Sequence, residues 1–120
     1  MPPLSCIPVG FVAGLHVYIM ALEMFFWTKP RAMKAFGTKL EYAKQTQGLA
    51  ANQGLYNGFL AAGLGWGLAH PVAYFGSQIQ LFFLGCVAVA GFYGGITVKP
   101  KIMLIQTLPA TIGMLAVCFS

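Results

Sequence analysis

Charged residues are scarce in this sequence. Of its 120 residues, only 8% are Asp, Glu, Lys or Arg, whereas 58% are hydrophobic. A soluble domain usually carries about 25% charged residues. A chain so poor in charge, with apolar runs long enough to cross a bilayer, is typical of an integral membrane protein. Its length suits one small domain, residues 1–120.

Cysteine is also scarce, and the common catalytic motifs are missing. The three cysteines, Cys6, Cys86 and Cys118, form no CxxC pair, which argues against a thioredoxin-like redox motif or a zinc knuckle. The sequence lacks HExxH, GxSxG, P-loop and dinucleotide-binding motifs. Haem ligation by His16 and His70 is disfavoured, because the two histidines are expected at different depths. We therefore expect no cofactor and no metal.

Four apolar segments have the length that a membrane span requires, which is about 20 helical residues. The predicted transmembrane helices are residues 7–27, 49–69, 79–98 and 102–119. The sequence thus predicts an all-α fold, a bundle of four transmembrane helices. Pro109 is expected to kink the last helix, because it removes one helical hydrogen bond and crowds the carbonyl of Ile105.

Every basic residue lies in one of two predicted loops. The first loop holds Lys29, Arg31, Lys34, Lys39 and Lys44, and the third holds Lys99 and Lys101. The positive-inside rule places both loops in the cytoplasm, or in the matrix or stroma of an organelle, and both termini on the outer side. The expected location is a multi-pass protein of the bacterial inner membrane or of an organelle membrane. Membrane lipids are the expected partners of these loops, and nucleic acid is not.

The first loop also contains a helix start signal. The residues Thr38-Lys39-Leu40-Glu41 fit a capping box, with Thr38 as the cap and Glu41 three residues later. A helix is therefore expected to start there. It either runs on into the second transmembrane segment or breaks at Gly48.

Glu23 is the acidic residue inside a predicted span, about four residues from its inner end. An ionisable group at the helix centre costs about 2.5–3.5 kcal/mol, and less near an end, so it needs a partner or a bound proton. The second and fourth spans enter from the same side, which brings their first polar residues to a similar depth. We predict an intramembrane polar cluster of Glu23, Asn52, Gln53, Asn57 and Gln106, with His16 on the same helix face as Glu23.

This cluster has two interpretations. In the functional one, Glu23 binds a proton, a cation or a cationic substrate. In the structural one, it accepts hydrogen bonds that hold the helices together, each worth about 0.6–2 kcal/mol. The structural interpretation is favoured.

Glycines recur at four-residue spacing along two of the predicted helices. Small residues at this spacing let helices approach closely in lipid. The predicted helix-packing residues are Gly54, Gly58, Gly63, Gly67, Gly91 and Gly95. We expect these faces to dock against other helices, in a homo-oligomer or in a complex with other membrane subunits.

Two blocks of the sequence resemble a known protein family. The first is the run His16, Tyr18, Leu22-Glu23-Met24-Phe25, Trp27-Thr28, Pro30 and Phe36-Gly37, and the second is the ANQGLYNG block, residues 51–58, with its flanks. Both are similar to domain-of-unknown-function family 1304, a family of small integral membrane proteins. The resemblance implies a four-helix membrane protein and marks Glu23, Asn52, Gln53 and Asn57 as motif positions. It implies no reaction.

Three functional hypotheses follow. The favoured one is a small structural or accessory membrane subunit that packs through glycine-rich helix faces, with no assigned biochemical activity. The alternative is a proton- or cation-coupled transporter that uses Glu23, because four helices with a glutamate in the first also resemble the small multidrug resistance transporters. A membrane enzyme acting on a lipid or quinone ranks last, because the sequence displays no nucleophile or cofactor motif.

Overall fold

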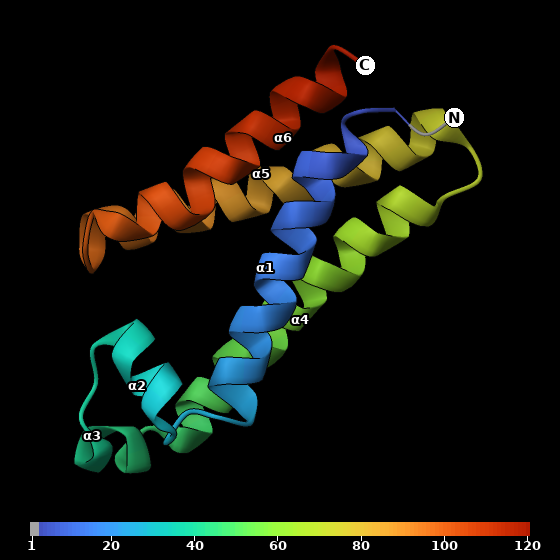
Figure 1. Ribbon diagram of the computed structural model, residues 1–120. Coiled ribbons are helices and arrows are strands. Elements are labelled where there is room, and N and C mark those ends of the chain that lie inside the picture. Colours follow the sequence, from blue (N-terminus) through green and yellow to red (C-terminus); the bar gives the residue numbers. More distant parts are fainter. Residues whose placement is uncertain (1–2) are drawn as a thin grey trace. The chain divides into compact units, whose positions relative to one another are not determined.

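The protein is all-α, as the sequence predicts. A computed structural model describes residues 3–120, and within this range it contains six α-helices, one π-helix and no strand (Figure 1). The helices are α1 (Cys6–Met24), α2 (Pro30–Phe36), α3 (Leu40–Gln45), α4 (Gln47–Ala69), α5 (Ala73–Thr97), the π-helix η1 (Met103–Thr107) and α6 (Leu108–Cys118). They form two compact units. The first unit contains the residues up to Gly14 and Leu60–Ser120, and the second unit is Leu15–Phe59.

Two helices of the described chain are long and apolar enough to cross a membrane. Helix α1 has 19 residues and α5 has 25, and their most apolar 18-residue stretches have mean hydropathies of 1.6 and 1.8. Helix α4 is also long, with 23 residues, but its first half carries four polar amides. The stretch Met103–Cys118 is apolar but shorter. The four-span bundle and the outer position of the termini therefore remain predictions.

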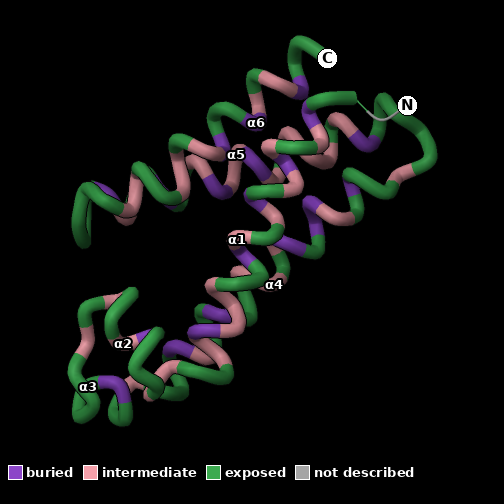
Figure 2. The backbone as a smooth tube through the Cα atoms, viewed as in Figure 1, coloured by how far each residue is buried: buried purple, intermediate pink, exposed green. Residues whose placement is uncertain are grey.

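The first unit has a small apolar core. The buried core residues are Val9, Val12, Leu64, Leu84, Val87, Ala110 and Val117. They come from the start of α1, the end of α4, the middle of α5 and from α6, and the buried positions follow one side of each helix (Figure 2). Gly113 of α6 lies against Leu84, where an added Cβ would come within 3.3 Å of the leucine methyls. The core thus joins helices that are distant in sequence.

Helices α4 and α5 form a tight hairpin. Helix α5 begins at Ala73 rather than at Ile79, because a helix can extend beyond its apolar segment through polar residues. His70 closes the turn by accepting a hydrogen bond from the Val72 N–H at its Nδ1 atom, at 3.0 Å. The Gln80 side-chain amide donates to the Gly67 carbonyl, also at 3.0 Å. The connection between the two helices is therefore only residues 70–72.

A kink was expected at Pro109, and the structure contains the π-helix η1 directly before this region. Its last turn closes with the N–H of Leu108 donating to the Met103 carbonyl, five residues earlier. Proline lacks the N–H that would bond the Ile105 carbonyl, and a wider turn relieves the crowding at that carbonyl. The helix therefore continues through Pro109 into α6 without a break. The Thr107 hydroxyl, at the end of η1, donates to the Ala88 carbonyl of α5 at 2.9 Å.

The first loop of the sequence contains two short helices, α2 and α3. Helix α2 ends at Gly37, whose left-handed backbone (φ 69°) suits glycine. Helix α3 begins at Leu40 as expected, but the predicted capping box is wrong. The N-cap is the extended residue Lys39, without a side-chain cap, and the buried Thr38 hydroxyl has no hydrogen-bond partner among residues 3–120. The helical segment is interrupted at Thr46, between α3 and α4, and not at Gly48.

Candidate functional site

Glu23 forms a hydrogen bond with Asn57 in the second unit. Glu23 lies in the last turn of α1 and Asn57 in the middle of α4. The Asn57 side-chain amide donates to Glu23 Oε1 at 2.6 Å and to the Gln53 carbonyl at 3.1 Å. Both donor hydrogens of the amide are therefore used, one of them across the helix pair. Both side chains are half-buried. Of the four motif positions, Glu23 and Asn57 are the two that lie farthest apart in the sequence.

Two glycines allow α4 to lie close enough for this bond. A Cβ at Gly54 would lie 2.6 Å from Met24 Cγ and 3.0 Å from Glu23 Cβ. A Cβ at Gly58 would lie 2.7 Å from Met20 Sδ. Gly54, Asn57 and Gly58 share one face of α4, since they are spaced three and four residues apart. The glutamate is thus held between two points of close helix approach.

The other predicted members of the polar cluster have separate surroundings. The exposed Asn52 side chain donates to the Gly48 carbonyl of its own helix at 3.1 Å, and Gln53 is exposed. His16 is completely buried on α1. Gln106 belongs to η1 in the first unit, where it packs against Gly91. The structure thus brings together Glu23 and Asn57 from the predicted set, and the wider cluster remains a prediction.

The four remaining packing glycines lie against other helices of the same chain. Gly63 of α4 faces the ring of Phe83, and Gly95 of α5 faces Met103. A Cβ at Gly67 would lie 3.0 Å from the Gly76 carbonyl oxygen, and one at Gly91 would lie 2.7 Å from the Thr107 nitrogen. The glycine faces that the sequence displays are therefore used inside the chain.

Two contacts that sequence reasoning missed shape the basic loop. The indole N–H of Trp27 donates to the Thr46 hydroxyl at 3.0 Å, which joins the beginning of the loop to its end. The Arg31 guanidinium donates to the Tyr18 hydroxyl at 3.4 Å, and this bond raises the pKa of Arg31. Tyr18 lies six residues before the end of α1, about 9 Å along the axis. The arginine therefore reaches back along α1. No motif or spacing in the sequence predicts either pair, because the sequence shows only that these side chains can form hydrogen bonds.

We expect Thr46→Val to lower the free energy of unfolding by about 1–2 kcal/mol. The substitution keeps the shape of the side chain but removes the acceptor of the Trp27 N–H, and a partly buried donor without a partner costs about 1–3 kcal/mol. The matched control is Thr97→Val, because the exposed Thr97 hydroxyl bonds only to the Tyr93 carbonyl of its own helix. Chemical unfolding in detergent, followed by tryptophan fluorescence, measures both. Equal small losses of stability in both variants would contradict a role for Thr46 in holding the two ends of the loop together.

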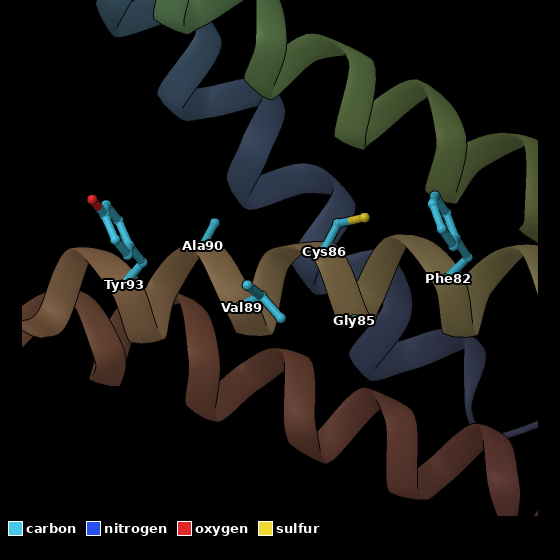
Figure 3. A pocket seen from close by; sticks show the side chains of 6 residues that line it. All are labelled: Phe82, Gly85, Cys86, Val89, Ala90 and Tyr93. Carbon is cyan, nitrogen blue, oxygen red and sulfur yellow. The ribbon is translucent and has the colours of Figure 1, made fainter.

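The site offers few groups for chemistry. Within residues 3–120, no three His, Cys, Asp or Glu residues gather where they could hold a metal ion, and all three cysteines are free thiols. A shallow apolar groove of about 660 Å³ lies along α5 and is lined by residues of this helix from Phe82 to Tyr93, Gly85 among them (Figure 3). This groove contains no ionisable group other than Cys86 and Tyr93. The arrangement suits helix packing better than bond-making chemistry.

Comparison with known proteins gives a family without an assigned role. The sequence model of the family described as "Protein of unknown function (DUF1304)" matches residues 10–118. The chain is similar to the uncharacterized protein YpaA of Lactococcus lactis subsp. lactis (strain IL1403), with 30% identity over 99 residues that cover 79% of this chain and 80% of the relative. No solved structure matches the chain.

Proposed function

Because the chain belongs to the DUF1304 family, whose function is unknown, we propose a role from its own residues: a small, non-enzymatic integral membrane subunit. In this proposal it is a multi-pass protein with four transmembrane helices and both termini on the outer side. The two long apolar helices α1 and α5 support a membrane location. The basic residues of the first and third loops support the orientation.

One observation carries the structural role. The carboxylate of Glu23, which is the group best suited to chemistry, is bonded to Asn57 between the two close-approach glycines of α4. Carboxyl and amide groups that bond across two helices in lipid hold those helices in register. We infer that Glu23 locks α1 to α4. Its conservative replacement should then be tolerated, and its truncation should not.

A transporter is the second candidate, and the second oxygen of the same carboxylate favours it. Asn57 bonds Oε1 of Glu23, and no other side chain or backbone donor among residues 3–120 bonds the carboxylate. The remaining oxygen of a half-buried acid can take a proton or a cation. In this alternative transport requires the negative charge, and Glu23→Gln is expected to abolish transport.

The variants Glu23→Gln and Glu23→Ala test the structural lock. For a structural lock, we expect Glu23→Gln to keep the bond to Asn57 and to change the free energy of unfolding by less than about 0.5 kcal/mol. Glu23→Ala leaves the Asn57 amide without its partner, and should cost about 1–2 kcal/mol. Unfolding by sodium dodecyl sulfate in mixed micelles, followed by circular dichroism, measures both variants. Equal losses for both would mean that the charge itself is required.

Transport is measured on the same proteins. Wild type and Glu23→Gln are reconstituted into liposomes under a pH gradient, and uptake is followed for a panel of organic and inorganic cations. Uptake by wild type that disappears in Glu23→Gln would establish the transporter. Absence of uptake with an intact Glu23→Gln fold supports the structural subunit.

The accessory role is tested by extraction. The open face of α5 between Phe82 and Tyr93 leaves room for a further helix beside Gly85, since a Cβ added at Gly85 would meet no atom of another helix within 4 Å. We expect the protein, extracted from its native membrane in a mild detergent, to appear in native mass spectra with another membrane subunit or with a second copy. A monomer at every detergent concentration would count against an accessory role.

A further inference from the structure

The loop between α1 and α4 carries a positive charge that the chain does not neutralise. Five cations lie between Thr28 and Gln47, with one acid, Glu41, so the loop has a net charge of +4 (5 − 1). The sequence has two acidic side chains, and the other one, Glu23, accepts a hydrogen bond from Asn57. Anions from outside the chain are therefore needed to neutralise this loop.

The structure holds these cations close to the end of α1. Trp27 and Thr46 bond the two ends of the loop to each other at 3.0 Å. The bond from Arg31 to Tyr18 draws the start of α2 back along the last turns of α1. A loop held at both points stays near the level where the helices end, and in a membrane protein this is the level of the lipid headgroups.

Apolar side chains are exposed among the cations of this loop. Phe25, at the end of α1, is 68% exposed, and Leu40 and Tyr42 of α3 are 46% and 55% exposed. The small residues Ala32 and Ala43 instead face inward. A surface that mixes exposed aromatic and aliphatic groups with lysines fits the boundary between headgroups and acyl chains. A purely aqueous polyanion would not use the apolar groups.

From these observations we propose that the α2–α3 loop is a docking surface for anionic phospholipid headgroups. The residues are Lys29, Arg31, Lys34, Lys39 and Lys44, with Leu40 and Tyr42 entering the boundary of the acyl chains. This inference rests on the membrane placement proposed above. Phosphate oxygens accept hydrogen bonds from lysine and arginine and supply the missing negative charge. The surface therefore prefers phosphatidylglycerol over phosphatidylcholine.

The test measures which lipid gathers around Trp27, from the quenching of its fluorescence. The full chain with Trp66→Phe keeps one of its two tryptophans and is reconstituted into phosphatidylcholine nanodiscs. These contain a fixed fraction of brominated phosphatidylglycerol or of brominated phosphatidylcholine, and bromine quenches nearby tryptophan. We expect stronger quenching by the anionic lipid. This preference should weaken when the ionic strength is raised from about 0.1 M to 1 M, as the Debye length falls from about 10 Å to 3 Å.

Two charge-matched double variants locate the surface. Lys34→Gln with Lys44→Gln removes two exposed cations from the last turns of α2 and α3. It should lower the preference for phosphatidylglycerol by about five-fold per cation, or about 25-fold. Lys99→Gln with Lys101→Gln removes the same charge from the connection before η1 and should leave most of the preference. Equal losses from both pairs would show a diffuse effect of net charge and overturn the proposed surface.

The remaining outcomes separate this inference from the proposed function. Equal quenching by the two lipids overturns the headgroup surface and leaves the membrane placement standing. Quenching by neither lipid overturns the membrane placement near Trp27 itself. A single-stranded oligonucleotide is added to the protein in neutral detergent as a third arm. Binding that is lost in the Lys34 and Lys44 variant and unaffected by added phosphatidylglycerol would assign the surface to a soluble polyanion and overturn the lipid proposal.

Discussion

Replacing Gly91 by alanine should lower the free energy of unfolding by about 1–2 kcal/mol, although alanine is the better helix former. The added methyl would meet the Thr107 hydroxyl, the Thr107 nitrogen at 2.7 Å and the Gln106 Cβ at 2.8 Å. Two of these atoms belong to the backbone or lie next to it, so they cannot turn aside. Overpacking of this kind costs about 1–3 kcal/mol, and the gain in helix propensity of about 1 kcal/mol offsets part of it.

The expected loss includes a hydrogen bond. The Thr107 hydroxyl donates to the Ala88 carbonyl at 2.9 Å, and moving η1 away from α5 breaks this contact. Such a bond between helices contributes about 0.6 kcal/mol on average in membrane proteins. The π-helix before Pro109 also depends on the position of Thr107, because the hydrogen bond from Leu108 to Met103 closes around it.

Gly85→Ala is the matched control, since it makes the same change in the same helix. Nothing lies within 4 Å of a Cβ at Gly85, so the propensity of alanine should leave this variant as stable as wild type or more stable, by up to about 1 kcal/mol. Both variants are unfolded by sodium dodecyl sulfate in mixed micelles and followed by circular dichroism. If the two alanines had the same effect, α5 and η1 would not be in close contact at Gly91.

The all-α fold was predictable from sequence because apolar runs of about 20 residues have few alternatives in this composition. The ends of the helices were less predictable. Helix α5 begins at Ala73, six residues before the apolar run at Ile79 (79 − 73), because hydrogen bonding of the backbone continues where hydropathy falls. The capping box failed for a related reason. Gly37 already ends α2 in a left-handed conformation, and the extended Lys39 that follows starts α3.

The sequence predicts a polar cluster, of which the structure pairs Glu23 with Asn57. The expected depths brought Asn52, Gln53 and Gln106 to the level of Glu23, with Asn57 somewhat deeper in the membrane. Depth does not specify which side of a helix a residue occupies. Asn57 lies on the glycine side of α4, between Gly54 and Gly58, whereas the Asn52 side chain bonds back to Gly48. The positions of Gly54 and Gly58 therefore indicate which polar residue of α4 faces Glu23.

The glycines also show why helix contacts within a chain and between chains look alike in sequence. A small residue every four positions predicts close approach, and it does not name the partner. A Cβ added at Gly54, Gly67 or Gly91 would meet atoms of this chain at 3.0 Å or less. A Cβ added at Gly85 or Gly48 would meet nothing within 4 Å, although these glycines belong to the same two long helices. The spacing in the sequence thus selects glycines for close contact, and the structure identifies the helix that each of them contacts.

Replacing Gly54 by leucine should have the largest effect in the second unit, a loss of about 3–4 kcal/mol of unfolding free energy. A Cβ alone would lie 2.6 Å from Met24 Cγ, 3.0 Å from Glu23 Cβ and 3.1 Å from the Met20 carbonyl oxygen. The rest of a leucine side chain has no space unless α1 and α4 separate. Separation breaks the bond from Asn57 to Glu23, so overpacking and the lost hydrogen bond act together.

The control for this prediction is Gly48→Leu, six residues earlier on α4. Gly48 is exposed and has open space around it, so the variant should stay within about 0.5 kcal/mol of wild type. Unfolding in mixed micelles gives the free energies, and native mass spectrometry of both variants gives the oligomeric state. A Gly54→Leu protein that unfolds like wild type but loses a partner subunit would place this glycine between chains. Loss of stability in the isolated chain instead means that Gly54 keeps α1 and α4 together, with Glu23 and Asn57 as their polar link.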